Sequence, residues 1–101
     1  MNDARPVQTI AVFVRLQGRA GHEEALATAI RTVVAASRLE AGCLSIEGFR
    51  AADGLFFIHS RWVDEAAFEL HAALPHTVHF LASVEPLVDP PPEVTRTLPL
   101  S

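Results

Sequence analysis

Residues that could carry acid–base chemistry gather in one stretch of the chain, between Phe57 and Phe80. That stretch holds the only tryptophan, Trp62, and four of the five histidines, which are His59, His71, His76 and His79. An imidazole with a pKa of ~6.5 exchanges a proton near neutral pH, and an indole can stack on a flat ring. We expect any chemical site of this protein here, where a predicted strand runs into a predicted helix.

Strand alternation divides this stretch between two faces. In a strand over residues 55–62, Ser60 and Trp62 share one face, and His59 and Arg61 share the other. The Ser60 hydroxyl and the Trp62 indole N–H are therefore expected to point into one cavity under the helices. A surface or subunit-interface position is expected for His59 and Arg61.

Two histidines, His71 and His76, are the candidate catalytic residues, as a general base or as a partner of a developing oxyanion. The candidate substrate contacts are Ser60, Trp62, Phe68 and Phe80. Structural alternatives stay open for these positions. Trp62 also fits a core residue, His71 fits a contact with the sheet or a turn cap, and His76 fits an exposed residue in the first turn after Pro75.

A metal site and a cysteine nucleophile are the competing chemistries. The imidazoles of His71, His76 and His79 could bind zinc with an open coordination position. However, Pro75 interrupts the helical register between the first two, and no carboxylate recurs at ligand spacing. Cys43 has no partner visible in the sequence and fits a small buried hydrophobe. We therefore predict no metal and no cofactor, and the sequence contains no phosphate-binding or dinucleotide-binding glycine motif.

Composition narrows the partners. The 101 residues carry a formal net charge of -4 with no lysine, and the arginines form no basic stripe, which argues against nucleic acid and anionic membranes. A single cysteine rules out an internal disulfide and favours a reducing compartment. The first residues lack the apolar core of a signal peptide, and no apolar run reaches the ~18 residues of a membrane helix. We expect a cytoplasmic protein, and the arginine and alanine bias hints at a bacterial source.

Hydrophobic periodicity predicts six main elements in one domain over residues 1–101, after a flexible tail over 1–6. The expected strands cover 7–16, 43–50, 55–62 and 93–98, and the expected helices cover 22–39 and 65–84, with a break at Pro75. Gly21 and Gly42 are expected to cap the first helix at its two ends, and Asp64 is expected to cap the second. Asp53-Gly54 predicts a tight hairpin between the second and third strands.

The order β-α-β-β-α-β predicts an α+β fold of the ferredoxin-like type, an antiparallel sheet with its helices on one face. The first and third strands are expected at the centre of the sheet. The other face carries Phe13, Phe49 and Phe57, which is too apolar to remain in water. We therefore expect a homodimer that packs sheet against sheet.

Several short motifs, in this order, resemble the antibiotic biosynthesis monooxygenase family, which includes small quinol monooxygenases. The stretch Glu40-Ala41-Gly42-Cys43 resembles the family's E-x-G-C signature after the first helix. The run from Trp62 to Ala67 resembles its W-x-(D/S)-x-x-A step into the second helix, and His71 to His76 resembles H-x-x-x-P-H. The resemblance covers about residues 7–100 and extends to the proline-rich approach to the last strand.

The resemblance implies a dimeric α/β barrel in which each subunit holds a pocket between its sheet and its helices. The best-known members of this family oxidise phenols or hydroquinones to quinones with O2 and without metal or flavin. Two positions depart from its pattern. Ser60 stands where many relatives carry glutamate, which removes one acid–base group, and the first strand lacks the asparagine of the haem-degrading branch.

We therefore expect a cofactor-independent monooxygenase that oxidises a small aromatic phenol or hydroquinone to a quinone. Two alternatives remain. One is a non-catalytic dimeric protein that binds a small ligand in the same pocket. The other is an isomerase-type member of the family that moves protons on a small metabolite, which would predict a smaller and more polar pocket.

Overall fold

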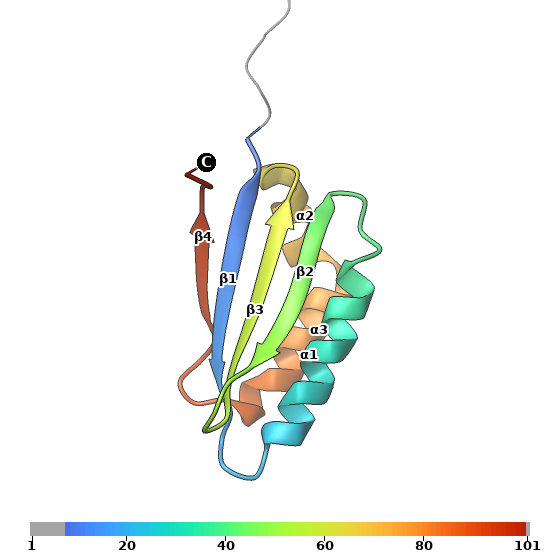
Figure 1. Cartoon of the computed structure of the whole chain (residues 1–101). Helices are drawn as coiled ribbons and strands as arrows, with labels where there is room; N and C mark the ends of the chain where they lie inside the picture. The colour runs from blue at the N-terminus through green and yellow to red at the C-terminus, as the bar shows by residue number, and fades with distance from the viewer. Residues whose placement is uncertain (1–7, 101) are drawn as a thin grey trace, which may run out of the picture.

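A computed structural model describes residues 8–100, so the predicted tail over residues 1–6 lies outside the described part of the chain. Four strands form one sheet in the order β2-β3-β1-β4, and every neighbouring pair is antiparallel. The strands are β1 (Ile10–Gln17), β2 (Cys43–Arg50), β3 (Leu55–Trp62) and β4 (Glu93–Thr97). Strands β1 and β3 occupy the centre, as the sequence predicts (Figure 1).

The helices lie together on one face of this sheet (Figure 1). They are α1 (Glu23–Ser37), α2 (Glu65–Ala73) and α3 (Pro75–Val84), followed by the short 3-10 helix η1 (Glu85–Leu87). This confirms the predicted α+β, ferredoxin-like fold. The sheet of one chain is open, with β2 and β4 at its edges. None of the helices in the described residues is both long enough and apolar enough to cross a bilayer.

The space between helices and sheet holds two apolar clusters. The larger one joins α1 and α3 to the sheet and is built around buried residues that include Leu16, Leu26, Ile30, Phe56 and Val84. The smaller one lies under α2 and contains Ile10, Val12, Trp62 and Phe68. Trp62 is fully buried in this smaller cluster, so the end of the sheet near α2 is organised around its ring.

The register of the central strands confirms the predicted division of faces. Ile10 pairs with Trp62 and Val12 pairs with Ser60, which places Ser60 and Trp62 on the helix-covered side. On the opposite face, the His59 ring lies 4.7 Å from the Phe13 ring and 4.9 Å from the Phe49 ring, centroid to centroid. The histidines of the stretch 57–80 are therefore split between the two faces of the sheet.

Local signals for turns and caps are confirmed at three places. The Asp64 carboxylate accepts the backbone N–H of Ala67 at 2.8 Å and caps α2. Pro75 stands in the first turn of α3, where its missing N–H costs nothing, so it starts a helix rather than only ending one. Asp53 and Gly54 both have positive φ, 61° and 75°, as the tight hairpin requires.

Two glycine predictions are wrong. His22, and not Gly21, is the residue before the first turn of α1, and the positive φ of Gly21 (85°) serves the turn that precedes it. Gly42 does not adopt a left-handed conformation. A Cβ at Gly42 would lie 2.4 Å from the Cβ of Ala67, so Gly42 is needed for the close packing of α2 and not for a helix cap.

A further difference concerns strand β2. Regular alternation along β2 would place Leu44 and Ile46 on one face, but the pairing of β2 with β3 is irregular between Cys43 and Ser45. This irregularity shifts the alternation by a residue, as a β-bulge does, so Ile46 is buried while Leu44 is 53% exposed.

Candidate functional site

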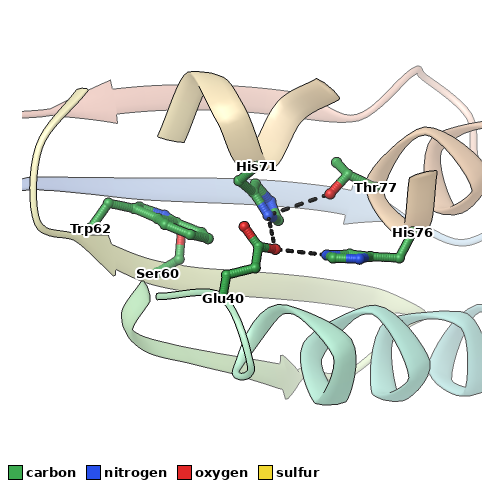
Figure 2. A network of polar contacts seen from close by, with 6 residues as sticks. All are labelled: Glu40, Ser60, Trp62, His71, His76 and Thr77. Atoms are coloured by element: carbon green, nitrogen blue, oxygen red, sulfur yellow. Dashed lines mark hydrogen bonds and ion pairs between the residues drawn. The ribbon is translucent and has the colours of Figure 1, made fainter. Parts of the chain in front are cut away.

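Glu40 joins the two candidate catalytic histidines into one polar network. Its Oε2 atom lies 2.8 Å from Nδ1 of His71 and 2.6 Å from Nε2 of His76 (Figure 2). The Thr77 hydroxyl lies 3.3 Å from the same Nδ1 of His71. Two imidazoles thus meet a single carboxylate oxygen.

Three separate segments bring these groups together. Glu40 lies in the turn between α1 and β2, which is fixed by backbone hydrogen bonds from Glu40 N to Ser37 O and from Cys43 N to Glu40 O. His71 lies in the last turn of α2, and His76 is the second residue of α3. Leu74, between them, is extended, with φ −71° and ψ 149°. A residue that precedes proline favours this extended conformation. Because Leu74 separates the two helices, the end of α2 and the start of α3 both lie next to Glu40.

The aromatic side of the site is formed by Trp62. The His71 ring lies 4.4 Å from the Trp62 ring and 5.6 Å from the Phe68 ring, centroid to centroid. The indole Nε1–H donates to Ser60 Oγ at 2.9 Å, and the Ser60 hydroxyl lies 3.4 Å from the carbonyl oxygen of Val12. The indole N–H therefore has its acceptor in the Ser60 hydroxyl, and the indole ring packs against the His71 ring from the sheet side.

Burial differs along the network. The side chains of Glu40 and His71 are each 10% exposed, whereas that of His76 is 29% exposed. His76 is thus the member through which the buried pair meets the surface.

Hydrogen-bond logic assigns the protons in this network. An ionised carboxylate can only accept, so Nδ1 of His71 and Nε2 of His76 are each assigned a hydrogen that they donate to Glu40. In the neutral rings the lone pairs then remain on Nε2 of His71 and Nδ1 of His76. Because His76 is the more exposed ring, its Nδ1 is the basic atom best placed to meet a small molecule.

A small cavity reaches His76 from the surface between α1 and α3. Its volume is about 150 Å³, and its lining includes Thr32, His76, His79, Phe80 and Ser83. A larger groove of about 320 Å³ lies between α1 and β2 beside Arg31, Arg38 and Arg50. Neither cavity is lined by Trp62 or Ser60. We regard the smaller cavity as the candidate site because it alone of the two contains a member of the histidine network.

The predicted site residues are thus only partly assembled. His71, His76, Ser60 and Trp62 come together, with Phe68 against Trp62 and Phe80 on the wall of the small cavity. His79 makes its contact with Ser83, 3.3 Å away on α3, and takes no part in the network. His59 lies on the opposite face of the sheet.

The residue that sequence reasoning missed is Glu40. It was visible as the first position of the E-x-G-C motif, but nothing local gave it a role, since His71 is 31 residues away. Its neighbour Cys43 fits the structural role expected of it. Burial, and to a smaller extent the charge of Glu40, raises the pKa of the Cys43 thiol, which disfavours the thiolate that a nucleophile needs.

A family model and a related protein both match most of this chain. The family model described as antibiotic biosynthesis monooxygenase matches residues 9–83. A Mycobacterium tuberculosis protein named "Putative monooxygenase Rv0793" is 29% identical over 92 residues, which is 90% of this chain and 91% of the relative.

Two solved structures resemble this chain over nearly its whole length. The structure of Rv0793 has a TM-score of 0.88, with 92% of this chain and 96% of that chain covered at 29% identity. PA3566 from Pseudomonas aeruginosa has a TM-score of 0.87 at 28% identity, with 97% of this chain and 100% of that chain covered. Since the family model spans most of the sequence, the chain belongs to the antibiotic biosynthesis monooxygenase family.

Proposed function

We propose that this protein is a cofactor-independent monooxygenase that oxidises a small phenol or hydroquinone to a quinone with O2. The observation that carries the proposal is the Glu40–His71–His76 network, which is largely buried and reaches a cavity through His76. The family assignment and a mycobacterial relative named as a monooxygenase support it.

The first step is removal of the phenol proton. Nδ1 of His76 takes the proton, and the resulting phenolate is electron-rich enough to pass an electron to O2. Glu40 stabilises the imidazolium that forms and keeps the ring oriented, as a carboxylate does for a general-base histidine elsewhere. A general base of this kind contributes about 10²- to 10⁴-fold to the rate.

The overall reaction needs no other reductant. A phenol with a free para C–H reacts with O2 to give a para-quinone and water, and a hydroquinone gives a hydroxyquinone and water. One oxygen atom enters the ring and the other leaves as water, with all four electrons supplied by the organic substrate.

The size of the cavity favours a single ring. A cavity of about 150 Å³ has the volume of an apolar cavity that binds benzene. Stacking of the substrate on Trp62 stays a prediction, because the indole is fully buried and α2 would have to move away from the sheet to expose it.

Oxygen consumption tests the proposal. The purified protein should consume O2 with substituted one-ring hydroquinones faster than their autoxidation, and His76→Gln should lower this excess rate at least about 100-fold. His79→Gln is the matched control, since His79 lines the same cavity without contacting Glu40, and it should retain most of the rate. Uptake no faster than autoxidation with one-ring and two-ring hydroquinones would overturn the proposal.

A second function is favoured by one feature of the cavity. Beside the apolar side chains of Ala29, Val33 and Phe80, its wall carries the polar side chains of Thr32, His76, His79 and Ser83, which could serve an isomerase that moves protons on a small metabolite. Such an enzyme would exchange C–H hydrogens of small α-hydroxyketones with D2O, measured by NMR, without consuming O2. If neither reaction occurs but a ligand binds with a saturable shift in melting temperature, the non-catalytic binding function remains.

A further inference from the structure

We propose that Glu40, His71 and His76 form a binding site for one divalent transition-metal ion, with Zn²⁺ as the best-matched ion. This goes beyond the proposed function, which uses no metal, and it does not depend on that function. It also revises the sequence-based hypothesis in two respects. Glu40 supplies a third ligand, and His79 is excluded.

The donor set is the first argument. Two imidazole nitrogens and one carboxylate oxygen are a common set of protein ligands for zinc, and the same set can hold other first-row divalent ions. Three protein ligands leave a coordination position open for water or a small molecule. Hard cations such as Mg²⁺ prefer oxygen ligands, so this site should discriminate against them.

The geometry is the second argument. The donor atoms of Glu40, His71 and His76 all lie within 4.8 Å of one another. Tetrahedral zinc with ligands ~2.0–2.1 Å from the ion holds its donor atoms ~3.3 Å apart. The two nitrogen–oxygen distances, 2.8 and 2.6 Å, therefore need to open by less than an ångström, and the two nitrogens, which lie within 4.8 Å of each other, need to settle near ~3.3 Å around one ion.

The position in the fold is the third argument. The ligands come from the turn after α1, from the end of α2 and from the start of α3, and they already converge without an ion (Figure 2). Figure 2 also shows Thr77 directed toward His71, so its hydroxyl lies at the edge of the proposed site. Since the three side chains already converge, binding needs shifts of side chains and not a change of fold, and the ion would tie the three segments together.

Bound metal would occupy the groups that the proposed monooxygenase needs. If the proposed function is correct, metal binding inhibits it, because the ion takes the place of the hydrogens through which Glu40 holds both imidazoles. If the proposed function is wrong, the binding itself is unaffected.

Isothermal titration calorimetry with ZnCl2 tests the proposal on tag-free protein treated with a chelator and then desalted. We expect one Zn²⁺ per chain and a saturable rise in melting temperature. His76→Gln and Glu40→Gln should each weaken binding by at least about tenfold, the lower end of the loss seen for even outer-sphere partners of a metal. His79→Gln should bind as the wild type does. Mg²⁺ should produce neither effect.

Two readouts keep the test decisive. His76 is partly exposed, so its replacement should fold even if that of Glu40 does not, and circular dichroism checks this. Co²⁺ in place of Zn²⁺ should give visible absorption bands of a four-coordinate site in the wild type and not in His76→Gln. No saturable Zn²⁺ binding up to 100-fold excess, or an equal loss in His79→Gln and His76→Gln, would overturn the site.

Discussion

At the residue scale, Glu40 has the largest influence on the site, because one carboxylate oxygen holds two imidazoles that belong to different helices. Without it, the buried His71 would lose its charged partner, and His76 would be oriented only by its own helix. The carboxylate therefore links the stability of the α2–α3 junction to the chemistry proposed there.

Replacing Glu40 with glutamine should lower both stability and activity. The side chain keeps its shape but loses the charge that strengthens two hydrogen bonds, so the free energy of unfolding should fall by about 1–3 kcal/mol, as measured by urea denaturation. The O2 consumption should fall with it. Glu85→Gln, which changes an exposed carboxylate in η1, is the control and should change neither. Equal losses in both variants would contradict the role assigned to Glu40.

Ser37 offers a test of stability alone. It is fully buried at the end of α1, and its hydroxyl oxygen has no hydrogen-bond partner among the described residues. Ser37→Ala removes a desolvated polar group, so we expect a gain of about 1 kcal/mol and a rise in melting temperature of roughly 4–8 °C for a domain of this size. Ser83→Ala, at a less buried position, should change stability by less than about 0.5 kcal/mol. A destabilised Ser37→Ala would show that the hydroxyl has a partner.

At the scale of elements, the contact between Gly42 and α2 decides how closely the helix approaches the strand ends. A Cβ at Gly42 would meet the Cβ of Ala67 at 2.4 Å, a separation that forces one segment to move. Because Glu40 lies two residues before Gly42 and His71 lies on α2, the same movement would separate the network. A glycine that looks like a helix cap in sequence is thus required by packing.

Gly42→Ala should therefore destabilise the protein by about 1–3 kcal/mol, the usual cost of overpacking, as measured by urea denaturation. Ala67→Gly alone should cost about 1 kcal/mol, because it places glycine inside a helix. The double variant should lose less than the sum of the two, since Ala67→Gly restores the missing space. Strict additivity in this double-mutant cycle would exclude the Gly42–Ala67 contact as the cause.

At the scale of the whole molecule, the face of the sheet opposite the helices leads us to propose a homodimer. Phe13 is 40% exposed and Phe49 is 44% exposed, and both lie on the sheet face that carries His59. The sheet is open, and a second copy packed on this face would cover the apolar side chains and complete the barrel implied by the family.

Light scattering coupled to size-exclusion chromatography tests this. The wild type should have about twice the 11.0 kDa mass of the chain. Phe13→Asp should shift the protein to the monomer, because a buried charge opposes association. Leu39→Asp, at a side chain that is 88% exposed in the turn after α1, should leave the dimer intact. An 11.0 kDa wild type would reject the dimer.

Local patterns in the sequence predict most of the fold. Alternation in β1 and β3, the Asp53-Gly54 hairpin, the Asp64 cap and the start of α3 at Pro75 depend on neighbours a few residues apart, and the structure confirms them. The caps of α1 are predicted wrongly. Gly21 forms the turn before the helix, and Gly42 allows close packing of α2, so neither glycine caps α1.

The candidate site, like the fold, is predicted only in part by local patterns in the sequence. The sequence by itself determined that Ser60 and Trp62 lie under the helices and that His59 does not, because strand alternation is a local property. Only the tertiary structure decided that Glu40 meets His71 and His76, which follow it by 31 and 36 residues. Their meeting depends on how closely α2 packs beside Gly42 and on where α3 starts after the break at Pro75. No pattern of neighbouring residues encodes these distances, because they result from packing between segments remote in sequence.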